Sequence, residues 1–242
     1  MKKLIGMLSL VAASSVVFAA DVSWSYEGET GPNAWVKLAP EFGACSGKNQ
    51  SPINLTNFIK ATLTPLKFNY HPGGFDVLNN GHTIQVNYAA GSTIIVDGVI
   101  FELKQFHFHA PSENQINGKS FPLEGHFVHA DKDGNLTVVA LMFETGATNK
   151  PLDQLAAVMP ATVGTPTTLA TPFSAEQLLP SKRDYYRFNG SLTTPPCSEG
   201  VRWIVLKHPV SISKEQIDAI QKVMYHPNNR PLQAVNARMV LE

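Results

Sequence analysis

The stretch "QFHFHA", residues 105–110, alternates polar and aromatic side chains and predicts a β-strand with two different faces. Successive side chains of a strand point to opposite faces, so Gln105, His107 and His109 share one face and the two phenylalanines between them share the other. The aromatic face is typical of a strand that packs on a core. The histidine face needs another explanation, because histidine is a poor filler for a core.

Runs of the same kind recur on both sides of this strand and predict a mainly β protein. Several alternate apolar and polar residues, and Gly, Asn, Asp or Pro separates them. The runs are residues 62–70, 75–80, 83–88, 92–98, 100–110, 123–130, 136–143 and 201–210. "DKDGN" (131–135) lies between two of them and predicts a hairpin turn. We therefore expect one mainly antiparallel β domain.

Helical patterns are few and short. "SISKEQIDAIQKVM" (211–224) places Gln216 three residues after Ser213, which is a capping box, and continues with an apolar stripe. "SAEQLL" repeats the start of this pattern from Ser174, and "LDQLAAVM" (152–159) stops before a proline. We expect these helices at the periphery of the sheet.

A third histidine follows in the next predicted strand, "LEGHFVHA" (123–130). Glu124, His126 and Val128 share one face of this strand, whereas His129 points the other way. If the two strands lie antiparallel in one sheet, His126 meets the histidine pair of the first strand. The alternative is that these are scattered core histidines with satisfied hydrogen bonds.

Three neutral imidazoles that converge leave one open tetrahedral position, which is the arrangement of a catalytic zinc site. Zinc is the expected ion, although imidazole also suits Cu, Fe and Ni. A zinc-bound histidine usually donates its other N–H to a nearby acceptor. Gln105 and Glu124 each lie two residues from a histidine on the same face, so each suits this part.

The segment "NGSLTTPPCSEGVRW" (189–203) predicts a rigid loop. Its two prolines have no N–H and fix the backbone, and two hydroxyls, Thr193 and Thr194, precede them. Its cysteine, Cys197, can pair with Cys45, because two cysteines in an exported chain predict a disulfide. The chain-entropy model assigns about 5 kcal/mol to such a long loop. The alternatives are an ordinary exposed turn and two free thiols.

Residues 1–19 have the pattern of a secretory signal peptide. Two lysines follow the initial methionine, residues 4–18 are apolar apart from Gly and Ser, and Val17 and Ala19 suit the positions before a cleavage site. The apolar stretch is shorter than the ~20 residues that a membrane anchor needs. We expect cleavage after Ala19, one domain over 20–242 and a periplasmic location, with release from the cell as the alternative.

The charge of the chain argues against a nucleic-acid partner. The 19 basic and 19 acidic residues balance, and without the two lysines of the signal peptide 17 basic residues face 19 acidic ones. The sequence has no basic patch and no basic–aromatic alternation. Charged residues make up 16% of the chain, below the usual ~25%, which fits a well-buried β domain.

Taken together, these motifs resemble the α-class carbonic anhydrase family over almost all of residues 20–242. The shared motifs are "WSYEGETGPNAW" (24–35), "NQSPINL" (49–55), "NNGH" (79–82), "QFHFHAPSE" (105–113), "LEGHFVH" (123–129), "GSLTTPPCSEGVRW" (190–203) and "NNRPLQAVNAR" (228–238). Their order and spacing match the family. The resemblance implies a single domain with a large, mostly antiparallel twisted β-sheet and short peripheral helices.

The resemblance also implies the parts of a zinc site. The implied zinc ligands are His107, His109 and His126, with Gln105, Glu124 and the backbone carbonyl of Asn228 as acceptors for their second nitrogens. Thr193 would accept a hydrogen bond from zinc-bound hydroxide and donate its own proton to Glu113. One departure is visible: Ala110 stands where animal members often have tryptophan, and this change removes no implied ligand.

Two further groups of residues follow from the same resemblance. The implied carbon dioxide site consists of Val128, Val138, Leu192, Thr194, Val201 and Trp203. The implied proton path to solvent consists of His82 with Tyr26, Asn80 and Gln85. The alternative for His82 is a plain turn residue, because "NNG" before it is a strong turn signal.

The function that the resemblance implies is zinc-dependent, reversible hydration of carbon dioxide to bicarbonate and a proton, a lyase reaction. Zinc-bound hydroxide would attack carbon dioxide, and a histidine would then carry a proton away. The alternatives are a non-catalytic binding module on the same fold and a periplasmic zinc-binding protein. The first would lack a zinc histidine and the second would often carry a His-rich segment, and the sequence shows neither feature. A homodimer stays open.

Overall fold

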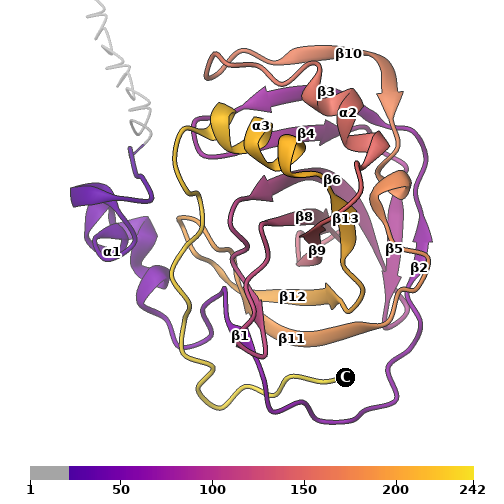
Figure 1. Cartoon of the computed structure of the whole chain (residues 1–242). Helices are drawn as coiled ribbons and strands as arrows, with labels where there is room; N and C mark the ends of the chain where they lie inside the picture. The colour runs from indigo at the N-terminus through magenta and orange to yellow at the C-terminus, as the bar shows by residue number, and fades with distance from the viewer. Residues whose placement is uncertain (1–21) are drawn as a thin grey trace, which may run out of the picture.

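One large β-sheet dominates the computed structural model, which describes residues 22–242 (Figure 1). Its eleven strands are β2 (Lys67–Asn69), β3 (Gly74–Asn79), β4 (Ile84–Tyr88), β5 (Thr93–Val96), β6 (Val99–His109), β8 (Leu123–Ala130), β9 (Leu136–Thr145), β10 (Thr167–Phe173), β11 (Tyr185–Ser191), β12 (Glu199–Leu206) and β13 (Val210–Ile212). The signal peptide predicted for residues 1–19 lies outside the described residues.

The strand order places β6 and β8 near the middle of the sheet. The main path is β10-β3-β4-β6-β8-β9-β12-β11, with β5 beside β6, β2 beside β5 and β13 beside β9. Neighbouring strands are antiparallel, except that β12 and β13 run parallel to β9. A separate parallel pair joins β1 (Asn54–Leu55) to β7 (Gln115–Ile116). The predicted mainly antiparallel β fold is therefore confirmed, and the turn at 131–135 joins β8 to β9 as expected.

Strand β6 contains an irregularity that a strict two-residue alternation misses. Its register with β8 shifts between Leu103 and Gln105. Because of this bulge, Phe101 and Leu103 before the shift pack in the same core as Phe106 and Phe108 after it. The histidines of β6 consequently face the other side of the sheet, away from this aromatic core.

Short helices lie outside the sheet, at the periphery of the domain, as predicted (Figure 1). They are the α-helices α1 (Trp35–Leu38), α2 (Lys150–Ala156) and α3 (Lys214–Met224) and the 3₁₀ helices η1 (Gly28–Thr30), η2 (Pro40–Ser46) and η3 (Ala175–Leu178). Leu152 and Leu155 of α2 and Ile217 and Ile220 of α3 are buried in the core that contains the aromatic face of β6. These two helices therefore cover the face opposite to the histidines.

The helix boundaries follow the caps more closely than the apolar patterns. Ser213 and Gln216 exchange both bonds of the predicted capping box at the start of α3. Helix α2 begins before the predicted range 152–159, because the side chain of Asn149 caps its first turn. The helix also ends before that range does, at Ala156. The pattern from Ser174 gives only a 3₁₀ turn, since the Ser174 side chain makes no capping bond.

Five strands were not predicted: the two-residue strands β1 and β7, strand β13, which only begins at the last residue of the predicted run 201–210, and strands β10 and β11. Strand β11 pairs with β12 over its whole length, although the sequence interpretation assigned the end of β11 to a loop. Strand β10 is largely exposed at the edge of the sheet, so it lacks the apolar alternation that reveals a strand. Within residues 22–242, no helix has the length and apolar character to cross a membrane.

Candidate metal centre

Three histidines converge on the face of β6 and β8 that points away from the aromatic core. His107 is paired directly with His126 across the two strands, and His109 follows on the same face of β6. One ring nitrogen of each histidine lies within 4.8 Å of those of the other two. The ring centroids are 5.0 Å apart for His107 and His109, 5.4 Å for His107 and His126, and 4.5 Å for His109 and His126. The structure thus brings the three predicted ligands into one cluster.

The second nitrogen of each ring contacts an acceptor. The contacts are His107 Nδ1 to Gln105 Oε1 at 2.8 Å, His126 Nε2 to Glu124 Oε1 at 2.9 Å, and His109 Nδ1 to the Asn228 carbonyl oxygen at 2.7 Å. Since an acceptor takes a ring N–H, we assign the remaining bare nitrogens as Nε2 of His107 and His109 and Nδ1 of His126. All three lone pairs are then free to bind one ion.

The environment of His109 fits a metal ion. Its Nε2 is buried and has no hydrogen-bond partner among residues 22–242. A buried polar atom without a partner is costly, and an ion bound between the rings would remove that cost. Three imidazole nitrogens with one position left open form the donor set of a catalytic zinc site.

Burial favours the neutral form of all three imidazoles, which is the form that binds a metal. Desolvation lowers the pKa of each ring below its ordinary value, and the shift is larger for His107 and His126 than for His109. The charges of the neighbouring histidines lower the pKa of His107 further. The hydrogen bond to the Asn228 carbonyl opposes the shift at His109.

Glu124, the acceptor for His126, is itself held by hydrogen bonds. Its Oε2 accepts the backbone N–H groups of Glu113 at 2.7 Å and Asn114 at 2.8 Å. Its Oε1 accepts the side-chain amide of Asn114 at 2.8 Å. Burial raises the pKa of Glu124, and these donors act against that rise. The carboxyl group that orients His126 is therefore fixed in place.

Glu113 places a second buried carboxyl group beside the cluster. Its Oε1 accepts a hydrogen bond from the backbone N–H of Arg230 at 2.8 Å. Its Oε2 lies 3.5 Å from His109 Nε2 and 3.9 Å from His126 Nδ1. Burial raises the pKa of Glu113 well above its ordinary value, while the Arg230 N–H and Thr193 act against that rise. Thr193 is close enough to act on this carboxyl, yet Oε2 has no hydrogen-bond partner of good geometry within residues 22–242. A divalent cation on the histidines would favour the ionised carboxylate.

A small cavity of about 120 Å³ lies beside two of the three histidines, His107 and His109. Its lining consists of Trp24, Tyr26, Asn80, His82, Thr83, Gln85, Gln105, His107, His109 and Thr194. It therefore includes the whole predicted proton path. The Asn80 side chain accepts the N–H groups of His82 and Thr83 at 2.9 Å each, so the predicted turn places His82 at the edge of this cavity.

The residues predicted to form an apolar wall pack together in a second core. Val138, Val201 and Trp203 are buried in this core, and Val128 and Leu192 pack against it. The Trp203 ring lies 4.9 Å from the ring of His126 and donates its N–H to the Ser191 carbonyl at 3.0 Å. This contact places the apolar cluster directly beside His126, one of the three predicted metal ligands.

The predicted disulfide is present and holds the loop that carries the threonines. The sulfur atoms of Cys45 and Cys197 are 2.05 Å apart. The Cys197 N–H donates to the Thr194 carbonyl at 2.8 Å, and the Gln50 side chain donates to the Cys197 carbonyl at 3.1 Å. The loop is therefore fastened to the early chain by a covalent bond and by a hydrogen bond.

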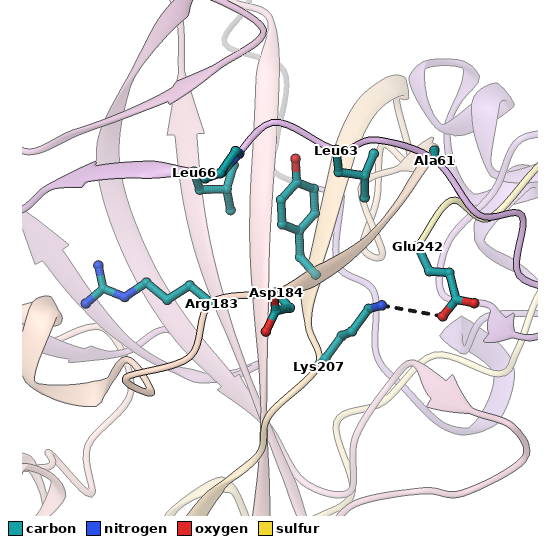
Figure 2. A pocket seen from close by; sticks show the side chains of 9 residues that line it. Ala61, Leu63, Leu66, Arg183, Asp184, Lys207 and Glu242 are labelled. Atoms are coloured by element: carbon teal, nitrogen blue, oxygen red, sulfur yellow. Dashed lines mark hydrogen bonds and ion pairs between the residues drawn. The ribbon is translucent and has the colours of Figure 1, made fainter.

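Larger hollows elsewhere on the molecule contain none of the predicted site residues. One, of about 340 Å³, is drawn in Figure 2, where Lys207 and Glu242 form an ion pair at 3.4 Å. Its labelled lining is Ala61, Leu63, Leu66, Arg183, Asp184, Lys207 and Glu242. Another, of about 820 Å³, lies between the β5–β6 turn and the β8–β9 turn. Size alone therefore does not identify the site here.

Sequence reasoning did not single out Arg230. This buried side chain donates to the carbonyls of Ser51 and Cys45 and to the Gln50 side chain, and it lies over the Trp35 ring at 5.3 Å. Burial lowers its pKa to about 10, while the charge of Glu113 opposes the shift. Arg230 thus ties the segment around Cys45 to the site. The one sequence signal for this role of Arg230 is its place in the motif at 228–238.

Comparison with known proteins gives the family. The family model described as eukaryotic-type carbonic anhydrase matches residues 30–242. The carbonic anhydrase of Pectobacterium carotovorum is 51% identical, and the match covers 98% of this chain and 99% of that protein. The carbonic anhydrase of Neisseria gonorrhoeae is 48% identical, and the match covers 98% of this chain and 94% of that protein. The α-carbonic anhydrase of Thermovibrio ammonificans, solved with the inhibitor sulfanilamide, has a TM-score of 0.90 and 50% identity over 92% of this chain and 100% of that one.

Proposed function

We propose that this chain, which belongs to the eukaryotic-type carbonic anhydrase family and is an enzyme of that family, converts carbon dioxide and water reversibly into bicarbonate and a proton. One observation carries the proposal. Three histidine nitrogens converge beside a buried carboxyl group and an apolar cluster, and His109 Nε2 among them has no partner within the described residues.

We assign the metal as zinc and its ligands as His107, His109 and His126. When bound, zinc lowers the pKa of water and supplies hydroxide as a nucleophile near neutral pH. Gln105, Glu124 and the Asn228 carbonyl hold the ligand rings in the tautomers that such an ion requires.

Thr193 and Glu113 orient the nucleophile. An ionised Glu113 can only accept, so the Thr193 hydroxyl donates its proton to that carboxylate. The lone pairs of Thr193 are then left to accept a hydrogen bond from an oxygen that still carries a proton. This arrangement would favour an oxygen that carries a proton over one that can only accept, and a hydroxide held in this way would turn its lone pair away from Thr193 and toward the substrate.

The apolar cluster suits carbon dioxide. The substrate is small and has no net dipole, so it needs a dry niche more than hydrogen-bond partners. We assign this niche to Val128, Val138, Leu192, Val201 and Trp203, with Thr194 beside it. The contact between Trp203 and His126 supports this assignment, because it brings the apolar residues beside a proposed metal ligand.

The proton leaves through the cavity that His82 borders. A histidine suits this step because its ordinary pKa lies near neutrality, so it accepts and releases protons readily. Tyr26, Asn80 and Gln85 line the same cavity and form the polar surroundings of the path. Removal of residues 1–19 as a signal peptide and a periplasmic location for the domain 20–242 complete the proposal, and the disulfide is consistent with export.

The test is bicarbonate formation by the purified protein, measured by stopped flow with and without a zinc chelator. We expect fast hydration that the chelator abolishes and added zinc restores. Zinc binding without hydration would identify a zinc-binding protein instead. Neither zinc binding nor hydration would identify a non-catalytic binding module on this fold.

A further inference from the structure

His226 lies where helix α3 ends, close to the edge of the cavity that contains His82. Tyr225 adopts a left-handed conformation, with φ of 64°, and ends the helix. The chain then turns at His226 toward Asn228, whose side chain donates to the His82 carbonyl at 3.0 Å. This hydrogen bond therefore links the segment after α3 directly to the turn that carries His82.

The Tyr26 ring lies next to both imidazoles. Its centroid is 6.5 Å from that of His82 and 6.2 Å from that of His226. On its other side, His82 is stacked on Trp24, with centroids 3.7 Å apart and ring planes 7° apart. The stack holds His82 at the edge of the cavity. His226 is not among the residues that line this cavity, but it packs against the same Tyr26 ring.

The two histidines also interact through charge. Burial, and after it the charge of His226, lowers the pKa of His82. The pKa of Tyr26, the titratable group packed against both rings, is raised well above its ordinary value by burial, so it stays protonated near neutral pH. A positive charge on His226 therefore disfavours a proton on His82, so the two imidazoles are close enough to be coupled electrostatically.

The surroundings of His226 give that proton an exit. His226 Nδ1 lies 3.0 Å from the Pro227 carbonyl, so we assign the proton to Nδ1 and the free lone pair to Nε2. The half-buried ring also lines a separate hollow of about 230 Å³, beside Ala110 and Pro111. Because His226 lines this hollow, a base in the hollow can reach the ring and take up its proton.

We propose that His226 is the outer residue of a two-histidine proton relay, which accepts the proton that His82 carries out of the cavity and releases it on the side of α3. The proposal rests on the proposed function. His82 as imidazolium gives its proton to solvent between the rings, His226 Nε2 takes one up, and His226 then gives it to a buffer base. Both imidazoles return to the neutral form, so no charge accumulates.

The test combines kinetics with proton NMR of the imidazole rings. His226→Gln keeps a polar side chain of similar size but cannot carry the proton. In dilute, weakly basic buffer we expect a severalfold loss of kcat with little change in kcat/KM, and recovery in concentrated imidazole. The matched control is His208→Gln, at an exposed histidine paired with Asp184, which should leave kcat unchanged. In the NMR titration, the pKa of His82 should rise when His226 is replaced.

A double-mutant cycle separates a relay from an unrelated structural effect. If the two histidines act in series, His226→Gln should cost little more once His82→Ala has removed the inner member. An equal loss of kcat in both backgrounds would overturn the proposal, and so would an unchanged titration of His82. Absence of hydration by the unmodified protein would instead overturn the proposed function, while the NMR titration would still read the coupling of the pair.

Discussion

Glu113 Oε2 lies 3.5 Å from His109 Nε2, and neither atom has a hydrogen-bond partner among residues 22–242. Each atom lies in a fully buried side chain, where an unpaired polar group is costly. One is an oxygen acceptor and the other, by our assignment, a bare nitrogen, so they cannot satisfy each other while the carboxyl group is ionised. A cation bound to the imidazoles and a proton donated to Glu113 by Thr193 would satisfy both.

Thr193→Ala tests the second half of that arrangement. The variant removes the hydroxyl that we place between Glu113 and the nucleophile but removes no proposed metal ligand. We expect unchanged zinc content and a turnover lower by about 10²-fold, as for other lost orienting contacts. Thr193→Ser restores a hydroxyl and should recover most of the rate. Equal turnover in the alanine variant and the unmodified protein would refute the role of this pair.

Reduction of the Cys45–Cys197 bond tests how the threonine loop is held. The bond closes a loop with a sequence separation of 152 residues. Its loss should lower the free energy of unfolding by about 2–5 kcal/mol, measured by urea unfolding with and without reductant. The double variant Cys45→Ala and Cys197→Ala controls for direct effects of the reductant. Unfolding curves that coincide would show that the bond adds no stability.

His82→Ala tests the proton path. The hydration step precedes the exit of the proton, so we expect lower kcat in dilute buffer, little change in kcat/KM, and recovery with added imidazole. Because burial lowers the pKa of His82, the rise of kcat with pH should be centred below ~6.5. Full turnover by the variant in dilute buffer would mean that protons leave by another route.

His129 predicts an acid-sensitive step in stability. It is buried on the other face of β8, its Nε2 lies 2.6 Å from the Tyr70 hydroxyl, and burial lowers its pKa to about 3. In the unfolded chain the pKa of His129 is ~6.5. Between about pH 3 and pH ~6.5 the unfolded chain therefore binds a proton that the native protein does not bind. The contribution of His129 to the free energy of unfolding is complete above pH ~6.5 and is lost as the pH falls toward 3, by at most ~1.4 kcal/mol per pH unit.

The measurement is urea unfolding at several values between about pH 7 and pH 5. His129→Gln should flatten the dependence relative to the unmodified protein, because it removes one proton uptake. Tyr70→Phe, which keeps the imidazole, should retain the slope although it lowers stability. Parallel pH dependences for the unmodified protein and His129→Gln would contradict this account.

Much of this site could be predicted because strand periodicity acts locally. The alternation in "QFHFHA" placed Gln105 and the two histidines of β6 on one face, and the same alternation separated His126 from His129. Only the pairing of the strands, however, sets the register that puts His107 opposite His126. The carbon dioxide niche and the proton path that we propose came from the family resemblance, because no local pattern contains them.

The remaining features depend on contacts between distant segments. The bulge between Leu103 and Gln105 reverses which residues of β6 face the core, and no single position in the sequence marks it. Arg230 is important through its bonds to the segment at 45–51, far away in the chain. The sequence analysis did not single out His226, because only the folded chain packs it against the Tyr26 ring that also lies near His82.

The most direct test of the central claim is a titration of the metal-free protein with zinc, with the carbon dioxide hydration rate as the readout. We expect a negligible hydration rate without metal and a linear rise in the rate that saturates at one equivalent of zinc. His126→Ala, which leaves two of the three ligands, should bind zinc poorly and stay nearly inactive, whereas His208→Ala should behave like the unmodified protein. Full hydration by the metal-free protein, or full zinc content and full rate in His126→Ala, would contradict the three-histidine site.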